Sequence, residues 1–201
     1  DWQIDVICGG SQKALSAPPG LAFVTVSDKA MEVMEHRKVP VASFYCNLLT
    51  FKNYKKEKWF PYTMPASDIN GLEEAVRLVQ EDTERITRHE KIAQAVRQAV
   101  TAAGLSLYLN FGDANTVTVI RVPEGMKDTD IIRHMKETYG ILISGSFDVL
   151  AGKVIRLGHM GNNARKDEVA AMLEALEKTL ADLGFVCKKS MAEEFAKVLD
   201  S

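Results

Sequence analysis

Hydrophobic and polar residues follow one another in blocks along this chain, and their spacing separates predicted strands from predicted helices. The two opening apolar blocks, 4–8 and 21–26, are continuous rather than alternating, which predicts strands covered on both faces, as in an α/β sheet. A segment rich in glycine, proline and small residues, 9–20, separates them. Residues 28–38 place their apolar side chains on one side and predict a short helix.

The middle of the chain predicts one long helix. Residues 68–103 contain no proline, and apolar residues recur every three or four positions, so we expect a continuous helix with a kink near Asp82. We expect Gly104 to cap the C-terminal end of this helix. Before it, the apolar segment 44–49 is compatible with a strand or a helix, and we favour the helix. The charged segment 52–58 predicts a solvated loop.

After Gly104 short strands and helices alternate. We predict strands over 105–110, 116–122, 140–144 and 153–157, and helices over 128–138, 166–183 and 191–199. This order is typical of a small α+β domain, in which helices cover an antiparallel or mixed sheet.

Composition narrows the function classes. Of the 201 residues, 46% are hydrophobic and 26% are charged, so we expect a globular core. The formal net charge of -2 gives no electrostatic basis for a nucleic-acid or anionic-membrane partner. No apolar run approaches the ~18 residues of a membrane span. We therefore predict neither partner.

The three cysteines, Cys8, Cys46 and Cys187, are widely separated and form no CxxC pair. This argues against a disulfide framework or a structural zinc site and favours a reducing, cytoplasmic setting. Cys8 lies in an apolar block and is predicted to be a small core residue. Three histidines show no metal-ligand spacing, so no metal site is predicted: His36, His89 and His134.

The segment 9–20 carries the most informative chemistry. Its glycines let a backbone approach a ligand closely, and Pro18 and Pro19 stiffen its exit. Lys13 is either an ordinary solvated charge or a Schiff-base nucleophile, because a lysine amine shifts its pKa readily when partly desolvated. Spacing alone favours the solvated charge.

Three further positions leave alternatives open. Arg156 stands in an apolar block, and its fork of donors suits a carboxylate of the protein or of a substrate; spacing alone favours the structural ion pair. Thr63 either offers its hydroxyl to a phosphate or belongs to a simple turn. His159 is equally compatible with a packed turn residue and with a catalytic one.

Three motifs, in this order, resemble the class V pyridoxal-phosphate aminotransferases, and within them the alanine–glyoxylate and serine–pyruvate aminotransferases. The first is Gly-Ser-Gln-Lys-Ala-Leu-x-Ala-Pro-Pro-Gly from Gly10. The second is a Thr-x-Pro turn at Thr63, before a long helix. The third is Gly-Lys-Val-x-Arg-x-Gly-x-x-Gly-x-Asn-Ala from Gly152. The likeness runs from the first residue to about Leu183.

The resemblance implies an α/β fold, that of the type I pyridoxal-phosphate-dependent transferases. Residues 1–67 would be the end of the large cofactor-binding domain, 68–104 a long connecting helix, and 105–201 the small C-terminal α+β domain. Family chains carry a preceding half with a glycine-rich phosphate turn, a stacking aromatic residue and an aspartate for the ring nitrogen. We therefore expect this chain to be a C-terminal part.

The resemblance also implies residue roles. Lys13 would carry the Schiff base with pyridoxal 5'-phosphate and shuttle a proton, and Gln12 would donate to the cofactor phosphate. Thr63 would reach the phosphate in a neighbouring subunit, which implies a homodimer with shared active sites. Arg156 would bind the substrate α-carboxylate. The implied reaction is ping-pong transfer of an amino group from an alanine- or serine-like donor to a 2-oxo acid such as glyoxylate or pyruvate.

One departure and two alternatives accompany this interpretation. Family members have a tyrosine three residues before the threonine, where this chain has Phe60, so Tyr62 is the candidate that supplies a cofactor-binding hydroxyl. A lyase or desulfurase on the same scaffold is the near alternative, and a desulfurase is disfavoured because no cysteine lies in an evident exposed loop. The second alternative is a folded interaction module without activity.

Overall fold

A computed structural model describes residues 2–200, which fall into two compact units. Unit 1 is Asp1–Gln80 and unit 2 is Glu81–Ser201. This geometric division does not decide the functional division into 1–67, 68–104 and 105–201, which stays a prediction.

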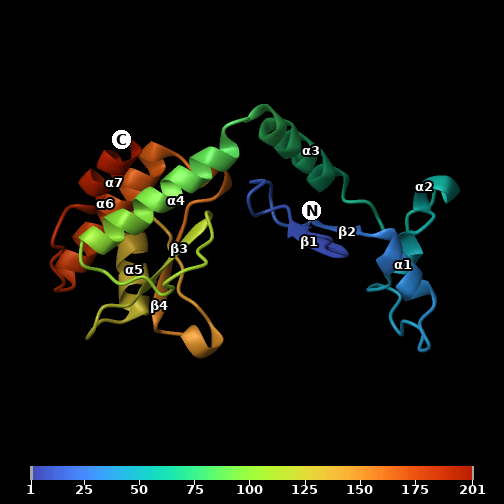
Figure 1. Cartoon of the computed structure of the whole chain (residues 1–201), viewed down its shortest axis with the longest axis horizontal. Helices are drawn as coiled ribbons and strands as arrows, with labels where there is room; N and C mark the ends of the chain where they lie inside the picture. The colour runs from blue at the N-terminus through green and yellow to red at the C-terminus, as the bar shows by residue number, and fades with distance from the viewer. Residues whose placement is uncertain (1, 201) are drawn as a thin grey trace. The chain divides into compact units, whose positions relative to one another are not determined.

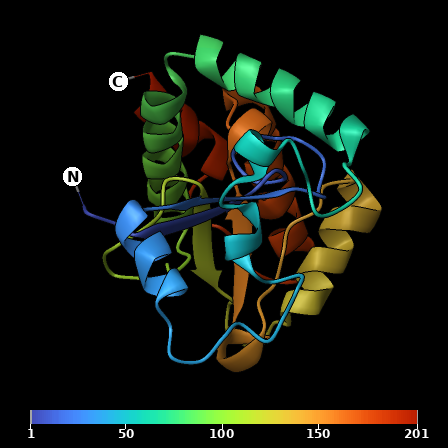
Figure 2. The same ribbon diagram turned by 90° about the vertical axis from the view of Figure 1, so that its right-hand side faces the viewer.

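Unit 1 is built on a β-hairpin (Figure 1). Its elements are β1 (Val6–Gly10), β2 (Ala22–Val26), α1 (Asp28–Glu35), the 3-10 helix η1 (Leu48–Phe51), α2 (Tyr54–Glu57) and α3 (Ala66–Glu81). The two strands are antiparallel, with Val6 opposite Val26 and Gly10 opposite Ala22, and they run side by side in Figure 2. Both predicted opening strands are therefore confirmed as strands.

The predicted burial of these strands on both faces is wrong for the described residues. Ile7 is 54% exposed and Phe23 is 42% exposed, and Cys8, expected in the core, is exposed as well. The reason is the pairing: within residues 2–200 the hairpin pairs with no third strand, so no central strand exists to be covered on two faces.

Polar side chains cap two of the short helices of unit 1 at their N-terminal ends. Ser27 caps α1, its hydroxyl accepting from the Ala30 N–H and donating to an Asp5 carboxylate oxygen 2.7 Å away. The helix predicted over 28–38 is confirmed, although it ends at Glu35. The helix favoured over 44–49 is wrong: only a 3-10 turn forms, where the Asn47 side chain accepts from the Leu49 N–H.

Two further expectations for the middle of the chain need correction. The segment 52–58, predicted as a loop, contains the one-turn helix α2. The predicted continuous helix is interrupted at 82–84, where α3 ends and α4 (Arg85–Ala102) begins. The interruption lies where the kink was expected. There Asp82 accepts a 2.9 Å hydrogen bond from Arg88 through its carboxylate and another from Arg85 through its carbonyl.

The end of α4 has the hydrogen bonds of a Schellman motif, as the position of Gly104 predicts. The Leu105 N–H donates to the Val100 carbonyl and the Gly104 N–H to the Thr101 carbonyl, each at 3.0 Å. Gly104 has a φ of +94°, and a Cβ there would lie 3.2 Å from the Lys188 side chain. Both features favour glycine.

Unit 2 combines a small sheet with a layer of helices. Its remaining elements are β3 (Val117–Arg121), α5 (Asp128–Tyr139), η2 (Asp148–Leu150), β4 (Val154–Gly158), η3 (Gly161–Asn163), α6 (Lys166–Asp182) and α7 (Met191–Leu199). The strands are antiparallel, with Val119 opposite Arg156. Two strands predicted at 105–110 and 140–144 reduce to single bridges, Leu107 with Ile120 and Ser144 with Arg156. Each segment pairs only briefly before it turns away.

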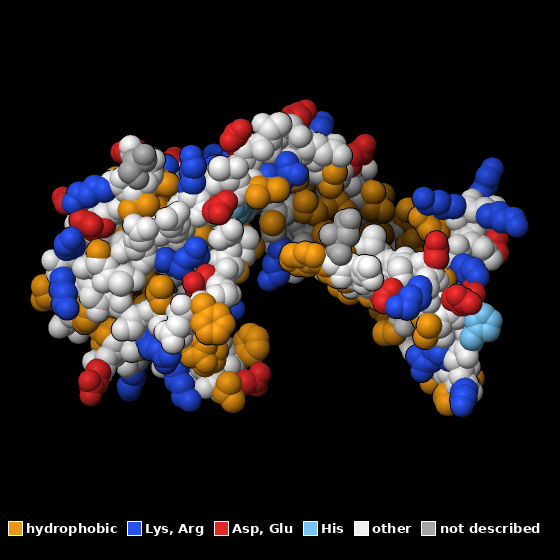
Figure 3. Space-filling view, in the orientation of Figure 1, with side chains coloured by type: hydrophobic (Ala, Val, Ile, Leu, Met, Phe, Trp, Pro, Cys, Tyr) orange, Lys and Arg blue, Asp and Glu red, His pale blue; other side chains and the backbone are white. Residues whose placement is uncertain are grey.

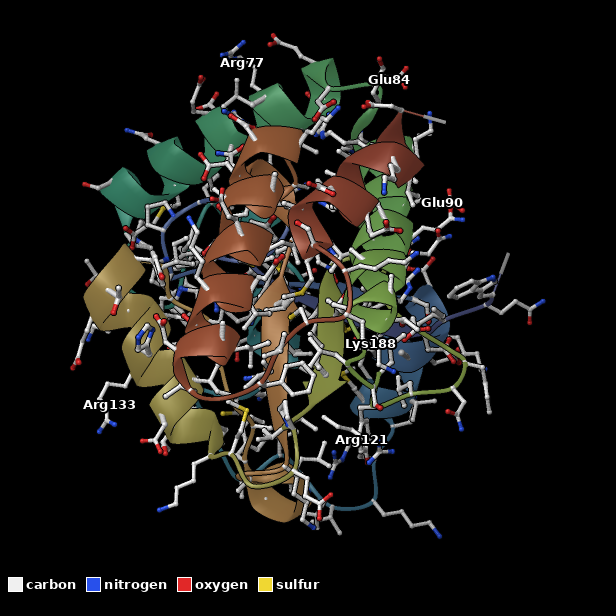
Figure 4. All side chains as sticks on the ribbon, turned by 90° about the vertical axis from the view of Figure 1, so that its left-hand side faces the viewer. Arg77, Glu84, Glu90, Arg121, Arg133 and Lys188 are labelled. Carbon is white, nitrogen blue, oxygen red and sulfur yellow. The ribbon has the colours of Figure 1, made fainter. Side chains whose placement is uncertain are left out.

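Helices cover one face of this sheet. The helices α5, α6, α7 and α4 lie next to one another in that order, in front of the strands in Figure 4. Their apolar sides pack on alternate strand residues, and the largest core side chains are fully buried: Ile120, Ile155, Leu157, Leu173, Leu176 and Phe195. This confirms the α+β architecture predicted for this part. No helix in residues 2–200 is long and apolar enough to cross a membrane.

Candidate functional site

The loop between β1 and β2 is closed by one buried serine. The Ser11 hydroxyl donates to the Pro18 carbonyl at 2.6 Å and accepts from the Leu21 N–H at 3.3 Å. The Ser11 backbone bonds to Leu21 and Ala17, each at 3.0 Å. Because Ser11 is only 1% exposed, these bonds are shielded from water and hold the two ends of the loop together.

Lys13 lies at the tip of this closed loop. Its N–H donates to the Gly10 carbonyl at 3.3 Å, and its own carbonyl accepts from the Ser16 N–H at 2.9 Å. Ser16 has a φ of +58°, in the left-handed region, so the chain reverses tightly after the lysine. The Lys13 backbone is therefore fixed on both sides, while its side chain is exposed.

The surroundings of Lys13 form an open pocket of about 580 Å³, all of it in unit 1. It is lined by Cys8, Gly9, Gly10, Lys13, Ala14, Leu15 and Phe23. A Cβ on Gly9 would overlap the Phe23 ring, and a Cβ on Gly10 would lie 2.7 Å from the Gln12 side-chain oxygen. The Lys13 amine makes no hydrogen bond or ion pair with any residue in the range 2–200.

Tyr62 and Thr63 differ in what they offer. The Tyr62 hydroxyl donates to the Tyr45 carbonyl at 2.9 Å, and its ring packs among other aromatic rings. These are Phe44, Tyr45, Phe51 and Phe60. Desolvation raises the pKa of Tyr62. Thr63 is exposed in the segment that leads into α3. This geometry supports a structural role for Tyr62 and leaves the Thr63 hydroxyl open to a ligand.

The first turns of α3 pack against the end of the Lys13 loop. A Cβ on Gly20 would lie 3.0 Å from the Asp68 carboxylate, and one on Gly71 would lie 3.9 Å from Pro18. The segment with Thr63 therefore leads directly into a helix that contacts this loop. No hydrogen bond between Thr63 and Lys13 or Gln12 is present among the described residues.

Arg156 lies on β4 in unit 2 and is half-buried. Its cross-strand partner is Val119, so it points to the face opposite the buried Ile155 and Leu157. Its Nε donates to the Gly145 carbonyl at 2.6 Å, and the Phe147 ring centroid lies 6.0 Å from its guanidinium carbon. In the described part of the chain it forms no salt bridge with a carboxylate. The structure therefore does not bear out the ion pair that spacing alone favoured.

His159 follows β4 on the core side and is completely buried. Its Nε2 lies 2.8 Å from the Thr118 hydroxyl, whereas Nδ1 has no hydrogen-bond partner among the described residues. Burial, reinforced by the nearby Arg97 charge, lowers the pKa of His159 to about 4. Of the two alternatives, the structure supports a packed, neutral turn residue.

The cysteines correct one step of the interpretation. Cys8 and Cys46 are exposed, and Cys46 lies in a turn, so burial gives no reason to disfavour a desulfurase. Within residues 2–200, no three potential metal ligands lie together. The motif residues found from the sequence are thus Lys13 and Gln12 on one loop, Thr63 before α3, and Arg156 on β4.

Three residues with evident positioning contacts escaped the sequence analysis. They are Ser11, which closes the loop, and Gly145 and Phe147, which contact the Arg156 guanidinium. A serine between Gly10 and Gln12 in a turn was a usable signal for the first. Gly145 and Phe147 contact Arg156 across a bend of the chain, and their residue types alone did not indicate this contact.

Comparison with known proteins agrees with these motifs. The model of the family described as aminotransferase class-V matches residues 1–172. The chain belongs to the class V aminotransferase family. The resemblance seen in the three motifs is thereby confirmed, and with it the type I transferase fold.

Individual relatives of this class V chain give the same picture. It is 40% identical over 202 residues to an uncharacterized aminotransferase of Methanocaldococcus jannaschii, an alignment that covers 98% of this chain and 52% of the relative. It is 37% identical over 188 residues to the L-aspartate–glyoxylate aminotransferase of Paracoccus denitrificans, covering 92% and 47%. The chain thus spans about half the length of the curated relatives it matches.

Solved structures support the fold of this class V chain. The crystal structure of pyridoxamine–pyruvate aminotransferase from Mesorhizobium loti matches with a TM-score of 0.90 at 31% identity. The match covers 98% of this chain and 52% of that one.

Proposed function

We propose that the intact protein is a pyridoxal-phosphate-dependent aminotransferase. It transfers an amino group from a small, alanine- or serine-like donor to a 2-oxo acid such as glyoxylate or pyruvate, in a ping-pong reaction. Family membership and relatives whose names specify glyoxylate or pyruvate support this reaction class. The observation that carries the proposal is the free Lys13 amine on a closed loop beside an open pocket.

The pocket fits the cofactor in two respects. A side chain at Gly9 would overlap the Phe23 ring, so glycine keeps this wall of the pocket open, and the Lys13 amine has no hydrogen-bond or ion-pair partner in residues 2–200. When bound, pyridoxal phosphate supplies an electron sink that stabilises negative charge at the substrate Cα. Lys13 then has two tasks: its Nζ is the covalent attachment point, and it carries a proton to and from the substrate Cα.

Two neutral donors serve the cofactor phosphate in this proposal. Gln12 follows directly after the buried Ser11, so the closed loop fixes the backbone position from which the Gln12 amide extends. The exposed Thr63 hydroxyl serves the phosphate of a neighbouring subunit, and the protein is therefore a homodimer with shared sites. We assign no phosphate contact to Tyr62, because its hydroxyl proton is donated to Tyr45.

Arg156 binds the substrate carboxylate. Its guanidinium has no carboxylate partner in the described part of the chain, and it leaves an apolar strand toward the side away from the core. A paired arginine would first have to exchange one carboxylate for another, whereas this one has its terminal donors ready. The exposed thiols of Cys8 and Cys46 suit a reducing, cytoplasmic compartment.

The attachment role of Lys13 is tested by trapping. The intact protein is mixed with pyridoxal phosphate, reduced with borohydride, digested and analysed by mass spectrometry. We expect the reduced pyridoxyl-phosphate group on the peptide that contains Lys13, and its loss in Lys13→Arg, which keeps the charge but cannot form the imine. The matched control is Lys29→Arg, an exposed lysine paired with Asp5 in the same unit. Modification of another lysine in preference to Lys13 would contradict the assignment.

The reaction class is tested separately with a panel of donors and acceptors. We expect alanine or serine with glyoxylate or pyruvate to give the highest turnover. Release of sulfide from cysteine, or of ammonia without amino transfer, would instead favour the desulfurase or lyase alternative.

A further inference from the structure

The Arg156 guanidinium is held by a backbone carbonyl rather than by an acid. Its Nε donates to the Gly145 carbonyl at 2.6 Å. An arginine can bind a carboxylate with two parallel hydrogen bonds either side-on, through Nε and one Nη, or end-on, through both Nη groups. Because Nε is already used, only the end-on pair remains for a carboxylate.

The carbonyl that occupies Nε is fixed to the same strand as the arginine. The backbone N–H of Arg156 donates to the Ser144 carbonyl at 2.6 Å, and the Ser144 N–H donates to the Arg156 carbonyl at 3.3 Å. Ser144 and Arg156 thus form an antiparallel bridge, and Gly145 is the next residue. The guanidinium and its acceptor therefore move together with β4.

Gly145 also lies close against α5. A Cβ at this position would lie 2.9 Å from an Asp128 carboxylate oxygen and 3.3 Å from the Ile132 side chain. The other oxygen of Asp128 accepts from the Thr129 N–H at 2.8 Å, which keeps the carboxylate in place at the start of the helix. Any side chain at 145 must displace the Gly145 carbonyl or Asp128.

Phe147 lies beside the same guanidinium. Its ring centroid lies 6.0 Å from the guanidinium carbon, within the range of a cation–π contact. Phe147 is 71% exposed, and the nearby Leu142 and Val149 are exposed as well. Figure 3 shows hydrophobic side chains on the surface of unit 2 near η2. A ring over the face of a guanidinium does not compete with a carboxylate that binds in its plane.

The segment beyond Phe147 is held in a tight turn. The Leu150 N–H donates to the Phe147 carbonyl at 3.2 Å and the Ala151 N–H to the Asp148 carbonyl at 3.1 Å. Asp148 has a φ of +52°, a left-handed conformation that costs free energy in a residue other than glycine. The turn thus keeps Phe147 beside the strand.

We infer that Gly145 and Phe147 are positioning residues of the Arg156 carboxylate site: the Gly145 carbonyl restricts the guanidinium to end-on binding, and the Phe147 ring covers one of its faces. This inference rests on the proposed role of Arg156 in binding the substrate carboxylate. To that role the inference adds the geometry of binding: the two Nη donors of Arg156 bind the two oxygens of a planar carboxylate.

The inference is tested by NMR on the intact protein labelled with ¹⁵N in its arginine side chains, without cofactor. Pyruvate is the probe, and pyruvamide, which lacks the charge, is the matched control ligand. In the free protein we expect a slowly exchanging Arg156 Nε–H. On titration with pyruvate the Nη signals should shift while the Nε–H stays protected, and pyruvamide should shift neither.

Variants separate the two contacts. Gly145→Ala should expose the Nε–H to exchange and weaken pyruvate binding about fivefold, the effect of one hydrogen bond. Phe147→Ala should weaken binding about two- to fivefold and leave the Nε–H protected. Phe111→Ala is the control, because this phenylalanine of the same unit is 85% exposed and has no contact with Arg156 among the described residues.

The outcomes distinguish this inference from the proposed function. If Arg156→Lys leaves pyruvate affinity unchanged, the carboxylate role fails and the inference fails with it. If Arg156→Lys abolishes binding but the Nε–H exchanges freely in the wild type, or Phe147→Ala binds normally, the carboxylate role stands and the inference is overturned. If Gly145→Ala does not fold, the exchange rate of the Arg156 Nε–H in the wild type and the pyruvate affinity of Phe147→Ala still test the inference.

Discussion

The Ser11 hydroxyl donates a 2.6 Å hydrogen bond to the carbonyl oxygen of Pro18, seven residues further along the chain. The hydroxyl oxygen of Ser11 also accepts from the Leu21 N–H, so one small side chain joins both sides of the loop that carries Lys13. The position of the amine therefore depends on a hydroxyl that has no contact with a ligand in the proposed site.

Replacing Ser11 with alanine should loosen this loop. The Pro18 carbonyl and the Leu21 N–H both lose a shielded partner, which we expect to lower the free energy of unfolding of unit 1 by about 1–3 kcal/mol. Borohydride trapping of pyridoxal phosphate on Lys13 should become slower, because the amine is no longer held in one place. Ser67→Ala, at an exposed position in α3, is the control and should change neither. Unchanged trapping in Ser11→Ala would show that closure of the loop does not position the amine.

Replacing Tyr62 with phenylalanine separates a structural role from a role in cofactor binding. The variant keeps the ring contacts but loses the hydrogen bond to Tyr45. We expect a thermal midpoint lower by a few degrees and an unchanged affinity for pyridoxal phosphate, measured by fluorescence titration. Thr63→Val, which removes an exposed hydroxyl at similar volume, should show the reverse: a weaker affinity and an unchanged midpoint. Loss of cofactor affinity in Tyr62→Phe would restore this hydroxyl as a ligand.

Replacing Gly104 with alanine should destabilise unit 2. Its φ of +94° is unfavourable for a residue with a Cβ, and that Cβ would press on the Lys188 side chain. We expect a loss of about 1–2 kcal/mol in the free energy of unfolding, measured with urea. Gly158→Ala is the matched control, since no atom lies within 4 Å of a Cβ there and its φ is not positive. Equal losses in both variants would contradict the capping explanation.

The stability of unit 2 should fall in mild acid because of His159. Its pKa is about 4 in the folded protein, against 6.5 for an unperturbed imidazole, so the unfolded chain binds the extra proton between these values. The free energy of unfolding should therefore decrease as the pH falls from 6.5 to 4, by about 3 kcal/mol in total, and the contribution should level off below pH 4.

The measurement is urea unfolding across this pH range in the wild type and in His159→Gln. The variant should be less stable at pH 7, because the contact with Thr118 changes, but its dependence on pH should be flatter. His36→Gln, at an exposed position, should keep the wild-type slope. A slope in His159→Gln as steep as in the wild type would assign the acid sensitivity to other groups.

The helices of unit 2 could be predicted because their apolar spacing matches their burial. The stripe of α6 includes Leu173 and Leu176, which are fully buried. The strand candidates at 105–110 and 140–144 failed because pairing, not composition, decides whether an extended segment becomes a strand. The sequence predicted a kink near Asp82, but a full break at 82–84 depends on which groups bond to Asp82, and a helical pattern does not reveal that.

The candidate site was predictable only in part, for a related reason. Lys13 stands out because its motif combines glycine, proline and one amine in a short segment. The partner of Arg156 does not stand out, because it is the carbonyl of Gly145, eleven residues away, and every residue has a carbonyl. Burial of the opening strands failed as a prediction because an apolar block does not specify what will cover it.

The choice of a main-chain carbonyl as the partner of Arg156 has a consequence for the pH profile of turnover. A carbonyl carries no ionisable proton, and an arginine side chain stays cationic throughout the working pH range of proteins. Substrate capture is therefore expected to be insensitive to acidity. Any bell-shaped rate profile would then report the groups that transfer protons, Lys13 foremost, and would be free of a contribution from the anchoring of the substrate.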